Sequence, residues 1–342
     1  MIGYYVHHQG RGHLHRAHCL RTHIRMPMTI LSSLPLTEAS WPHTGAGMDT
    51  DWVTLARDDD GHPRGDPTAG AVLHWAPVHH PGLRQRMSSI ATWIEQVMPA
   101  VMVVDVSVEV TTLCRLMGIP VIAVAMPGDR TDRAHRLGYD LATALIACWP
   151  PSVIPPSWPR AWVEKTRFVG AFSRFDAQVD TSRADARPDG RRRAVLMLGA
   201  GGNIISRNDI QNAIGATPHW HWDILGAPDQ RWWADLWPTL RAADVVITHA
   251  GQNAVAEVAA ARTPAVIIPQ PRPHGEQHAT ATALDRAGLA TIAPRWPQAS
   301  AWPGLLNEAA SRDGQRWADW CPGDGAVRAA DLIESLAAGG TP

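Results

Sequence analysis

The sequence predicts an α/β protein built from two doubly wound domains that face each other across a cleft. Short apolar runs alternate with helix-like stretches through both halves of the 342 residues, the pattern of parallel sheets covered by helices. A Pro-rich and then polar interval separates the two halves. Small and polar residues directly follow several apolar runs, at the edge where open α/β sheets bind ligands.

In the first half, strands are expected at 2–6, 28–33, 100–105, 120–125 and 144–148, with helices at 13–25 and 107–117. Residues 40–70 are rich in Gly, Pro, Asp and His, which indicates surface loop. The run Asp58, Asp59 and Asp60 lies in this stretch and not at a strand end, so we expect a solvated loop there and not a metal site.

The composition then changes at the Pro-rich stretch 149–160 and the polar stretch 176–193, which favours an interdomain connection. We therefore expect an N-terminal acceptor-binding domain over 1–175, a linker over 176–193 and a C-terminal donor-binding domain over 194–342. Strands in the last domain are expected at 194–199, 220–226, 244–248, 265–269 and 289–293.

Charge and cysteine usage exclude several classes of function. Lys and Arg number 31 against 32 Asp and Glu, so nothing points to nucleic acid. The four cysteines form no C-x-x-C pair, which favours reduced thiols in a cytoplasm. Neither a signal peptide nor an apolar run of about 20 residues is expected.

One local exception to the charge balance lies in residues 1–37, which contain four arginines and no acidic residue: Arg11, Arg16, Arg21 and Arg25. One interpretation is a solvated face of the first helix. The other is a surface that meets an anionic acceptor or the inner face of a membrane. The predicted protein is cytoplasmic, with peripheral membrane contact only under the second interpretation.

The stretch DVVITHAGQNAVAE, residues 244–257, carries the strongest chemical signal. A strand runs into a turn with His249 and Gly251, and a helix begins near Gln252. A helix N-terminus favours a phosphate, and Gly251 lets the backbone approach it closely. Asn253 and Glu257 share one helix face, where Glu257 suits ribose hydroxyls. Alternatively, Asn253 caps the helix and Glu257 offsets its dipole.

Two glycine-rich turns follow other strands. The turn at 198–206 holds Gly199, Gly201 and Gly202; it can cradle a phosphate but lacks the G-K-[ST] ending of a P-loop. The turn at 6–17 holds Gly10 and Gly12 but no third glycine, which counts against NAD or FAD.

His13 stands at the helix start behind the first turn, where its side chain is a candidate for chemistry. No carboxylate or cysteine lies at ligand spacing nearby, which disfavours zinc. Asp105 ends a strand and could orient a catalytic His. The alternative for Asp105, or for Ser107, is helix capping.

On the basis of these residues, the segment 243–293 resembles the donor-binding segment of GT-B glycosyltransferases. The likeness is greatest to the UDP-glycosyltransferases and to the N-acetylglucosaminyltransferase of the peptidoglycan lipid intermediate. The family pattern H-x-G-x-N-x-x-x-E is met by His249, Gly251, Asn253 and Glu257, and the later P…[DE]-Q pattern by Pro264, Pro269, Glu276 and Gln277. The Gly turn at 199–202 and the G-x-G-H at 10–13 extend the likeness.

The resemblance implies two Rossmann-like domains and an inverting, metal-independent enzyme with no cofactor beyond its nucleotide-sugar donor, UDP or dTDP being favoured. It implies that His249 and Asn253 contact the diphosphate, that Gly251, Gln252 and the Gly turn belong to the donor-binding site, that Glu257 holds the ribose, and that Glu276 and Gln277 bind the sugar. It further implies that His13 is the general base supported by Asp105, with Gly10, Arg11 and Gly12 as the acceptor or phosphate loop. Trp232, Trp233 or Trp237 would pack on the base.

The chain also departs from the family. Arg262 stands where a glycine is usual, the loop 270–275 is longer, and Glu276 replaces the commoner Asp. The acceptor is left open among a small molecule, a saccharide and a lipid-linked intermediate. Two other functions also remain: a nucleotide-sugar hydrolase or epimerase, suggested by the G-x-G-H-x-x-R of Gly10, Gly12, His13 and Arg16, and a non-catalytic nucleotide-sugar binding protein.

Overall fold

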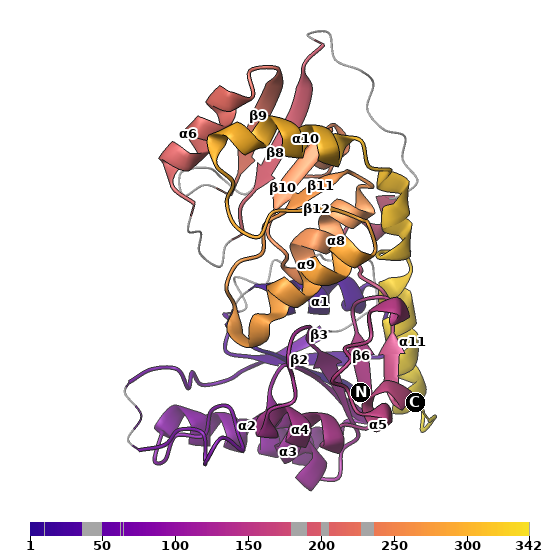
Figure 1. Ribbon diagram of the computed structural model, residues 1–342. Coiled ribbons are helices and arrows are strands. Elements are labelled where there is room, and N and C mark those ends of the chain that lie inside the picture. Colours follow the sequence, from indigo (N-terminus) through magenta and orange to yellow (C-terminus); the bar gives the residue numbers. More distant parts are fainter. Residues whose placement is uncertain are drawn as a thin grey trace. The chain divides into compact units, whose positions relative to one another are not determined.

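The computed structural model describes residues 1–9, 11–35, 50–61, 63, 65–178, 190–199, 205–226 and 236–341. The chain divides into two compact units (Figure 1). Unit 1 is Met1–Val169 together with Gly325–Pro342, and unit 2 is Gly170–Asp324. Each unit contains one parallel sheet covered by helices, which confirms the predicted α/β class.

The sheet of unit 1 has seven parallel strands in the order β3-β2-β1-β4-β5-β6-β7. The central strands are buried along their whole length, because helices cover both faces and apolar residues can point either way. The strands are β1 (Ile2–Val6), β2 (Met28–Ser32), β3 (Thr50–Thr54), β4 (Val101–Asp105), β5 (Val121–Ala125), β6 (Ala144–Ala147) and β7 (Thr166–Phe168).

Two groups of helices cover this sheet, on opposite faces in Figure 1. On one face α2 and α3 pack over a core that includes Ile90, Trp93, Val110 and Cys114, and α4 packs beside α3. On the other face α1 packs against α11. The helices are α1 (Gly12–Arg21), α2 (Pro81–Val97), α3 (Val108–Leu116), α4 (Arg133–Leu141), α5 (Arg160–Glu164) and α11 (Gly325–Ala337).

The sheet of unit 2 has five parallel strands in the order β12-β11-β10-β8-β9. In Figure 1, α6 and α10 lie on one face and α8 and α9 on the other. The strands are β8 (Arg192–Met197), β9 (Trp220–Leu225), β10 (Val245–Thr248), β11 (Ala265–Ile267) and β12 (Thr291–Ile292). The helices are α6 (Arg207–Ala216), α7 (Trp237–Arg241), α8 (Gln252–Ala260), α9 (Glu276–Arg286) and α10 (Trp302–Ala310).

Several expectations about the secondary structure were wrong. The expected loop 40–70 contains the edge strand β3, and the short edge strand β7 was not predicted. The Pro-rich stretch 149–160 is no interdomain connection, because it belongs to unit 1 and buries Trp149 and Trp158 there. Tryptophan burial outweighs the loop signal of the surrounding prolines.

The boundaries of the two units differ from the expected 1–175 and 194–342. Unit 2 begins at Gly170, and α11 belongs to unit 1, where it packs against α1 and β4. Ala329 and Ile333 are fully or almost fully buried, and Glu334 accepts the backbone N–H groups of Arg25 and Met26. Of the expected linker 176–193, residues 179–189 lie outside the described part of the chain.

None of the helices in the described ranges has both the length and the hydropathy needed to cross a membrane.

Candidate functional site

In unit 1, the strand order places the end of β1 beside the end of β4. From β1 the chain continues to β2 on one side, and from β4 to β5 on the other, while β1 and β4 pair with Val6 opposite Asp105. Such a switch point leaves room beyond the carboxyl ends of the strands, where open α/β sheets bind ligands. It brings the loop before α1 next to Asp105.

His13 and Asp105 form a hydrogen-bonded pair at this switch point. His13 is the second residue of α1, and its Nδ1 lies 2.8 Å from Oδ1 of Asp105. An ionised carboxylate can only accept, so Nδ1 carries a proton, and in the neutral imidazole Nε2 is then the proton acceptor. The Asp105 side chain is fully buried, whereas that of His13 is 16% exposed. The pair therefore has the geometry of a carboxylate-oriented base.

Asp105 is held by two further groups. Arg16, one helical turn after His13, donates from one guanidinium nitrogen to both carboxylate oxygens at 2.6 and 2.8 Å. The Tyr4 hydroxyl donates to Oδ2 at 3.2 Å. Burial alone would raise the pKa of Asp105, but the attraction of Arg16 and His13 lowers it to about 2. Asp105 is thus ionised throughout the neutral range.

The rest of the first predicted loop is only partly described. Gly10 lies outside the described residues, Arg11 is exposed at the N-cap of α1, and Gly12 opens the helix. The alternative role for Asp105 was helix capping, but Ser107 caps α3 by accepting the N–H of Val110. Asp105 is therefore used by His13 and its neighbours.

The expectation that the early arginines line a solvated helix face was wrong for two of them. Arg16 and Arg21 are only 4% and 5% exposed. Arg16 is buried against Asp105, and Arg21 donates to Thr50 and to the carbonyl of Ile24. A buried guanidinium needs such partners, because desolvating an unpaired charge is costly.

A second histidine lies beside His13. The ring centroids of His7 and His13 are 6.0 Å apart, and Nδ1 of His7 accepts the backbone N–H of Gln9 at 3.1 Å. Burial, with His13 and His8 adding repulsion, lowers the pKa of His7 to about 3. His7 is therefore neutral at neutral pH and places no positive charge against His13.

The acidic run at 58–60 is not simply a solvated loop. Asp58 is buried and pairs with Arg86 at 3.1 Å, while Asp59 lies 3.3 Å from Nε2 of His8. Arg86 also donates to Tyr5, Ser33 and the carbonyl of Ala56. Because Arg86 already neutralises Asp58, a cation bound here would have to displace or oppose a buried guanidinium. This group joins the loop to the sheet.

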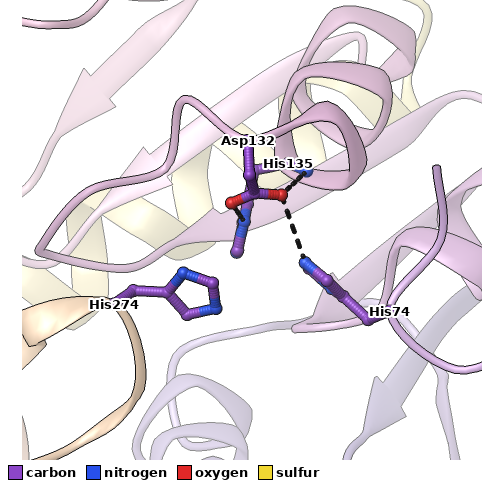
Figure 2. A group of neighbouring side chains, drawn as sticks. All are labelled: His74, Asp132, His135 and His274. Atoms are coloured by element: carbon purple, nitrogen blue, oxygen red, sulfur yellow. Dashed lines mark hydrogen bonds and ion pairs between the residues drawn. The ribbon is translucent and has the colours of Figure 1, made fainter. Parts of the chain in front are cut away.

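Another group of residues of metal-ligand types lies in unit 1, around the N-terminus of α4. Figure 2 shows Asp132 between the rings of His135 and His74. Asp132 caps α4, accepting the N–H of His135. The Arg130 guanidinium, always a donor, lies 3.1 Å from Nε2 of His135, which fixes the proton on Nδ1, facing Asp132. These contacts explain the cluster as a helix cap.

In unit 2, the switch point lies between β8 and β10. From β8 the chain passes to β9 on one side, and β10 lies on the other. Gly199 follows β8, and His249 follows β10. Gly251 is the N-cap of α8 without a side-chain cap, so the alternative in which Asn253 caps this helix was wrong. Gln252 and Asn253 open the helix, where its dipole favours an anion.

His249 is clamped between two glycines. A Cβ on Gly199 would lie 2.3 Å from its Nε2, and one on Gly251 would lie 2.5 Å from its Cε1. The Gly251 N–H donates to Nδ1 at 2.9 Å, so the neutral ring carries its proton on Nε2. Burial, with Arg272 adding repulsion, lowers the pKa of His249 to about 4. The side chain is thus a neutral N–H donor at neutral pH.

Glu257 has a partner that the sequence did not suggest. It is buried on α8, and its Oε1 lies 3.0 Å from Nε of Arg174, which is itself 43% exposed. Burial raises the pKa of Glu257, and Arg174 opposes that rise. Arg174 has no motif around it in the sequence, and only the packing of residues 170–178 into unit 2 reveals it.

The predicted Glu–Gln pair begins α9. Glu276 is its first residue, and Gln277 is 3% exposed and accepts the backbone N–H of Gln270 at 2.9 Å. Nε2 of Gln277 would lie 3.8 Å from a Cβ on Gly251. Gln277 therefore borders the His249 turn.

A cavity of about 160 Å³ lies at the carboxyl ends of β8, β10 and β11. Its lining includes His249, Gln270, Ile205, Ile268 and Trp296. Of the other predicted donor residues, Trp237 is buried and packs 5.1 Å from the ring of Phe175. Gly201, Gly202, Trp232 and Trp233 lie outside the described residues.

Comparisons with known proteins show which family and which fold the chain is similar to. Residues 233–297 match the family described as glycosyltransferase family 28 C-terminal domain. The chain is similar to the UDP-N-acetylglucosamine–N-acetylmuramyl-(pentapeptide) pyrophosphoryl-undecaprenol N-acetylglucosamine transferase of Clavibacter sepedonicus, with 29% identity over 66% of this chain and 67% of the relative. The transferase of the same name from Clavibacter michiganensis subsp. michiganensis is 28% identical over the same shares.

Solved structures share the fold across both units. The glycotransferase of kitacinnamycin aligns with a TM-score of 0.69 at 19% identity, over 98% of each chain. The calicheamicin glycosyltransferase CalG4 aligns with a TM-score of 0.67 at 16% identity, over 100% of this chain and 99% of that one. MurG of Acinetobacter baumannii aligns with a TM-score of 0.62 at 14% identity, over 98% of this chain and 99% of that one. The fold is GT-B. The family match and the two named relatives show that the chain is a glycosyltransferase.

Proposed function

We propose that the chain is an inverting glycosyltransferase that moves a sugar from a nucleoside diphosphate to an acceptor hydroxyl without a metal ion or other cofactor. The observation that carries this proposal is the His13–Asp105 pair, with Nδ1 on the carboxylate at 2.8 Å and Nε2 left as acceptor. A general base oriented in this way is what removal of a hydroxyl proton requires.

In the proposed reaction, Nε2 of His13 takes the proton of the acceptor hydroxyl as its oxygen attacks the anomeric carbon. The bond from that carbon to the diphosphate oxygen breaks, and the diphosphate leaves with the electron pair. Attack opposite the leaving group inverts the anomeric centre. The imidazolium that forms is stabilised by the carboxylate of Asp105.

The leaving diphosphate would be stabilised in unit 2 without a cation. His249 offers a neutral Nε2–H, and the N-terminus of α8 at Gln252 and Asn253 adds its dipole. Gly199, with Gly201 and Gly202, would allow the backbone to approach the phosphates. We assign Glu257 to the ribose hydroxyls, and Glu276 and Gln277 to the hydroxyls of the sugar.

The relatives guide the choice of substrates to test. The Clavibacter transferases are named for UDP-N-acetylglucosamine and an undecaprenol-linked acceptor, and CalG4 for calicheamicin. We therefore propose UDP or dTDP as the nucleotide, with the acceptor drawn from small molecules, saccharides and lipid-linked intermediates. A lipid-linked acceptor would require peripheral contact with the inner membrane face.

The first experiment is a thermal-shift panel of UDP-N-acetylglucosamine, UDP-glucose, dTDP-glucose and GDP-mannose. Ligand at about 100 times its dissociation constant stabilises the native state by about 2.7 kcal/mol, which raises the melting temperature by several degrees. UDP or dTDP sugars should give that shift and GDP-mannose should not. No shift with any of the four would contradict the donor assignment.

Release of nucleotide from the binding donor then separates the functions. A transferase releases nucleotide only when an acceptor is added, and His13→Ala should retain donor binding while losing transfer. The G-x-G-H-x-x-R residues Gly10, Gly12, His13 and Arg16 favour a nucleotide-sugar hydrolase as the second candidate. Acceptor-independent release at the full rate would support it. A His13→Ala variant with unchanged binding and release would support a non-catalytic binding protein.

A further inference from the structure

The carboxylate of Asp105 accepts hydrogen bonds from two side chains, the imidazole of His13 and the guanidinium of Arg16. Oδ1 of Asp105 accepts from His13 at 2.8 Å and from Arg16 at 2.6 Å, and Arg16 also reaches Oδ2 at 2.8 Å. The Asp105 side chain is fully buried and that of Arg16 is 5% exposed. The guanidinium and the imidazole therefore meet at one oxygen, with little water to screen them.

This sharing fixes the position of the carboxylate. A buried aspartate can rotate about its last torsion, and one bond to His13 would not prevent that. Arg16 contacts both oxygens, and the Tyr4 hydroxyl bonds Oδ2 from β1. Together they leave Oδ1 as the oxygen that faces His13. The imidazole is then held in the tautomer with its proton on Nδ1.

The sharing also limits how strongly Asp105 attracts a proton to His13. A lone buried carboxylate would stabilise the imidazolium strongly and keep His13 protonated at higher pH. Arg16 neutralises that charge and places a cation close to the imidazole. A base must be unprotonated before it can act, and the guanidinium of Arg16 is a cation that shares Oδ1 of Asp105 with the imidazole of that base.

We propose that Arg16 is a positioning residue for the transfer reaction, which orients Asp105 toward His13 and sets the pH range in which His13 accepts a proton. This rests on the proposed function of His13 as the base. Arg16 acts through Asp105 and does not touch the reacting atoms.

The other groups around the pair are compatible with this role. His7 faces His13 from the end of β1 and is neutral, since burial lowers its pKa to about 3. The Tyr4 hydroxyl is neutral because burial and Asp105 raise its pKa. Burial likewise raises the pKa of the Cys148 thiol, at the end of β6, to about 11. Arg16 and Asp105 are thus charged, whereas these three neighbours are neutral.

The test measures the titration of His13 directly and needs no acceptor. Imidazole nitrogen resonances are recorded by NMR on the full chain labelled with ¹⁵N-histidine, and those of His13 are assigned by their loss in His13→Gln. In Arg16→Gln the titration midpoint of His13 should rise by about one to two pH units. Arg16→Lys keeps the charge and should restore most of the native midpoint.

Arg21→Gln is the matched control, because Arg21 is also buried on α1 but bonds Thr50 and the carbonyl of Ile24 instead of Asp105. It should lower the melting temperature without moving the His13 midpoint. An unchanged midpoint in Arg16→Gln, or an equal rise in Arg21→Gln, would overturn the proposal.

A second pair of variants covers the case in which Arg16→Gln does not fold. Asp105→Asn leaves Arg16 as an uncompensated cation beside His13, whereas Asp105→Asn with Arg16→Gln removes both charges. The His13 midpoint should be about one pH unit or more lower in the single variant. Equal midpoints in the two would refute the electrostatic role.

Activity separates this inference from the proposed function. With the donor and acceptor that give transfer, the acid limb of the pH–rate profile should move to higher pH in Arg16→Gln. An NMR shift without any loss of transfer in His13→Ala would remove the base assignment. Loss of transfer in His13→Ala without the NMR shift would remove Arg16 alone.

Discussion

Replacing Gly199 by alanine should disturb the proposed diphosphate site around His249 while leaving the fold of unit 2 in place. The new Cβ would lie 2.3 Å from Nε2 and 2.9 Å from Cδ2 of His249. Ordinary contacts are about 3.5–4.0 Å, so the ring must move by about 1 Å or more. His249 cannot move this far and keep the hydrogen bond from Gly251 at 2.9 Å.

The size of the two expected effects, on stability and on UDP affinity, follows from the displacement of the His249 ring. Overpacking of this kind costs about 1–3 kcal/mol of stability. A hydrogen bond to a charged group contributes about 1.5–3 kcal/mol, so misplacing the Nε2–H should weaken UDP binding by about 10- to 150-fold. Calorimetry with UDP gives the affinity, and urea unfolding gives the stability.

Gly215→Ala is the matched control for this substitution. Gly215 lies in α6, and a Cβ there meets nothing within 4 Å. Alanine in an exposed helix is about 0.5–1 kcal/mol better than glycine, so this variant should be slightly more stable and bind UDP normally. If Gly199→Ala binds UDP as tightly as the native chain, His249 does not contact the diphosphate.

Three other outcomes follow from the described contacts. Glu257→Gln should weaken the affinity for UDP alone by about tenfold, since the proposed charged contact with the ribose is lost. Glu276→Gln should weaken the affinity for the UDP-sugar and leave the affinity for UDP unchanged. The reverse result in calorimetry would exchange the roles of the two residues. Burial lowers the pKa of His7 from its ordinary value of 6.5 to about 3 in the fold, so the unfolded chain binds the proton first and stability falls as pH drops below about 6.5. His7→Gln should therefore reduce the loss between pH 7 and 5 by at most about 2 kcal/mol in urea unfolding, and an identical loss would refute this. Arg262 has a φ of 55° and donates to the carbonyls of Ala259 and Cys321. Losing both hydrogen bonds outweighs the relief of about 1 kcal/mol of backbone strain, so Arg262→Gly should be less stable than the native chain. A higher melting temperature of this variant would contradict the reasoning.

The parallel strands could be predicted because their signal is local. Continuous apolar runs such as 101–105 and 121–125 are long enough to stand out, and both strands are fully buried. The strand β3 was missed because Asp51 and Thr54 break its apolar pattern at a sheet edge, where burial is incomplete. Short edge strands take their structure from pairing with a neighbour, which no local pattern records.

The candidate site could likewise be predicted where a local pattern marks its residues, but not where contacts join residues far apart in the sequence. The residues after each strand could be expected to meet, because the carboxyl ends of parallel strands share one edge. His13 and Asp105 are brought together by that rule. The contacts of Arg16 with Asp105 and of Arg174 with Glu257 were not predicted, because a charged residue is normally exposed and the partners are 89 and 83 positions away in the sequence.

The last helix has a consequence for how the protein is made. Since α11 packs on α1 and β4, the N-terminal sheet is completed by a helix that is synthesised only after the whole of unit 2. Unit 2 is in this sense an insertion within unit 1, and it can fold before unit 1 closes. A premature stop near residue 325 would therefore damage the N-terminal sheet and spare the domain encoded just before the stop.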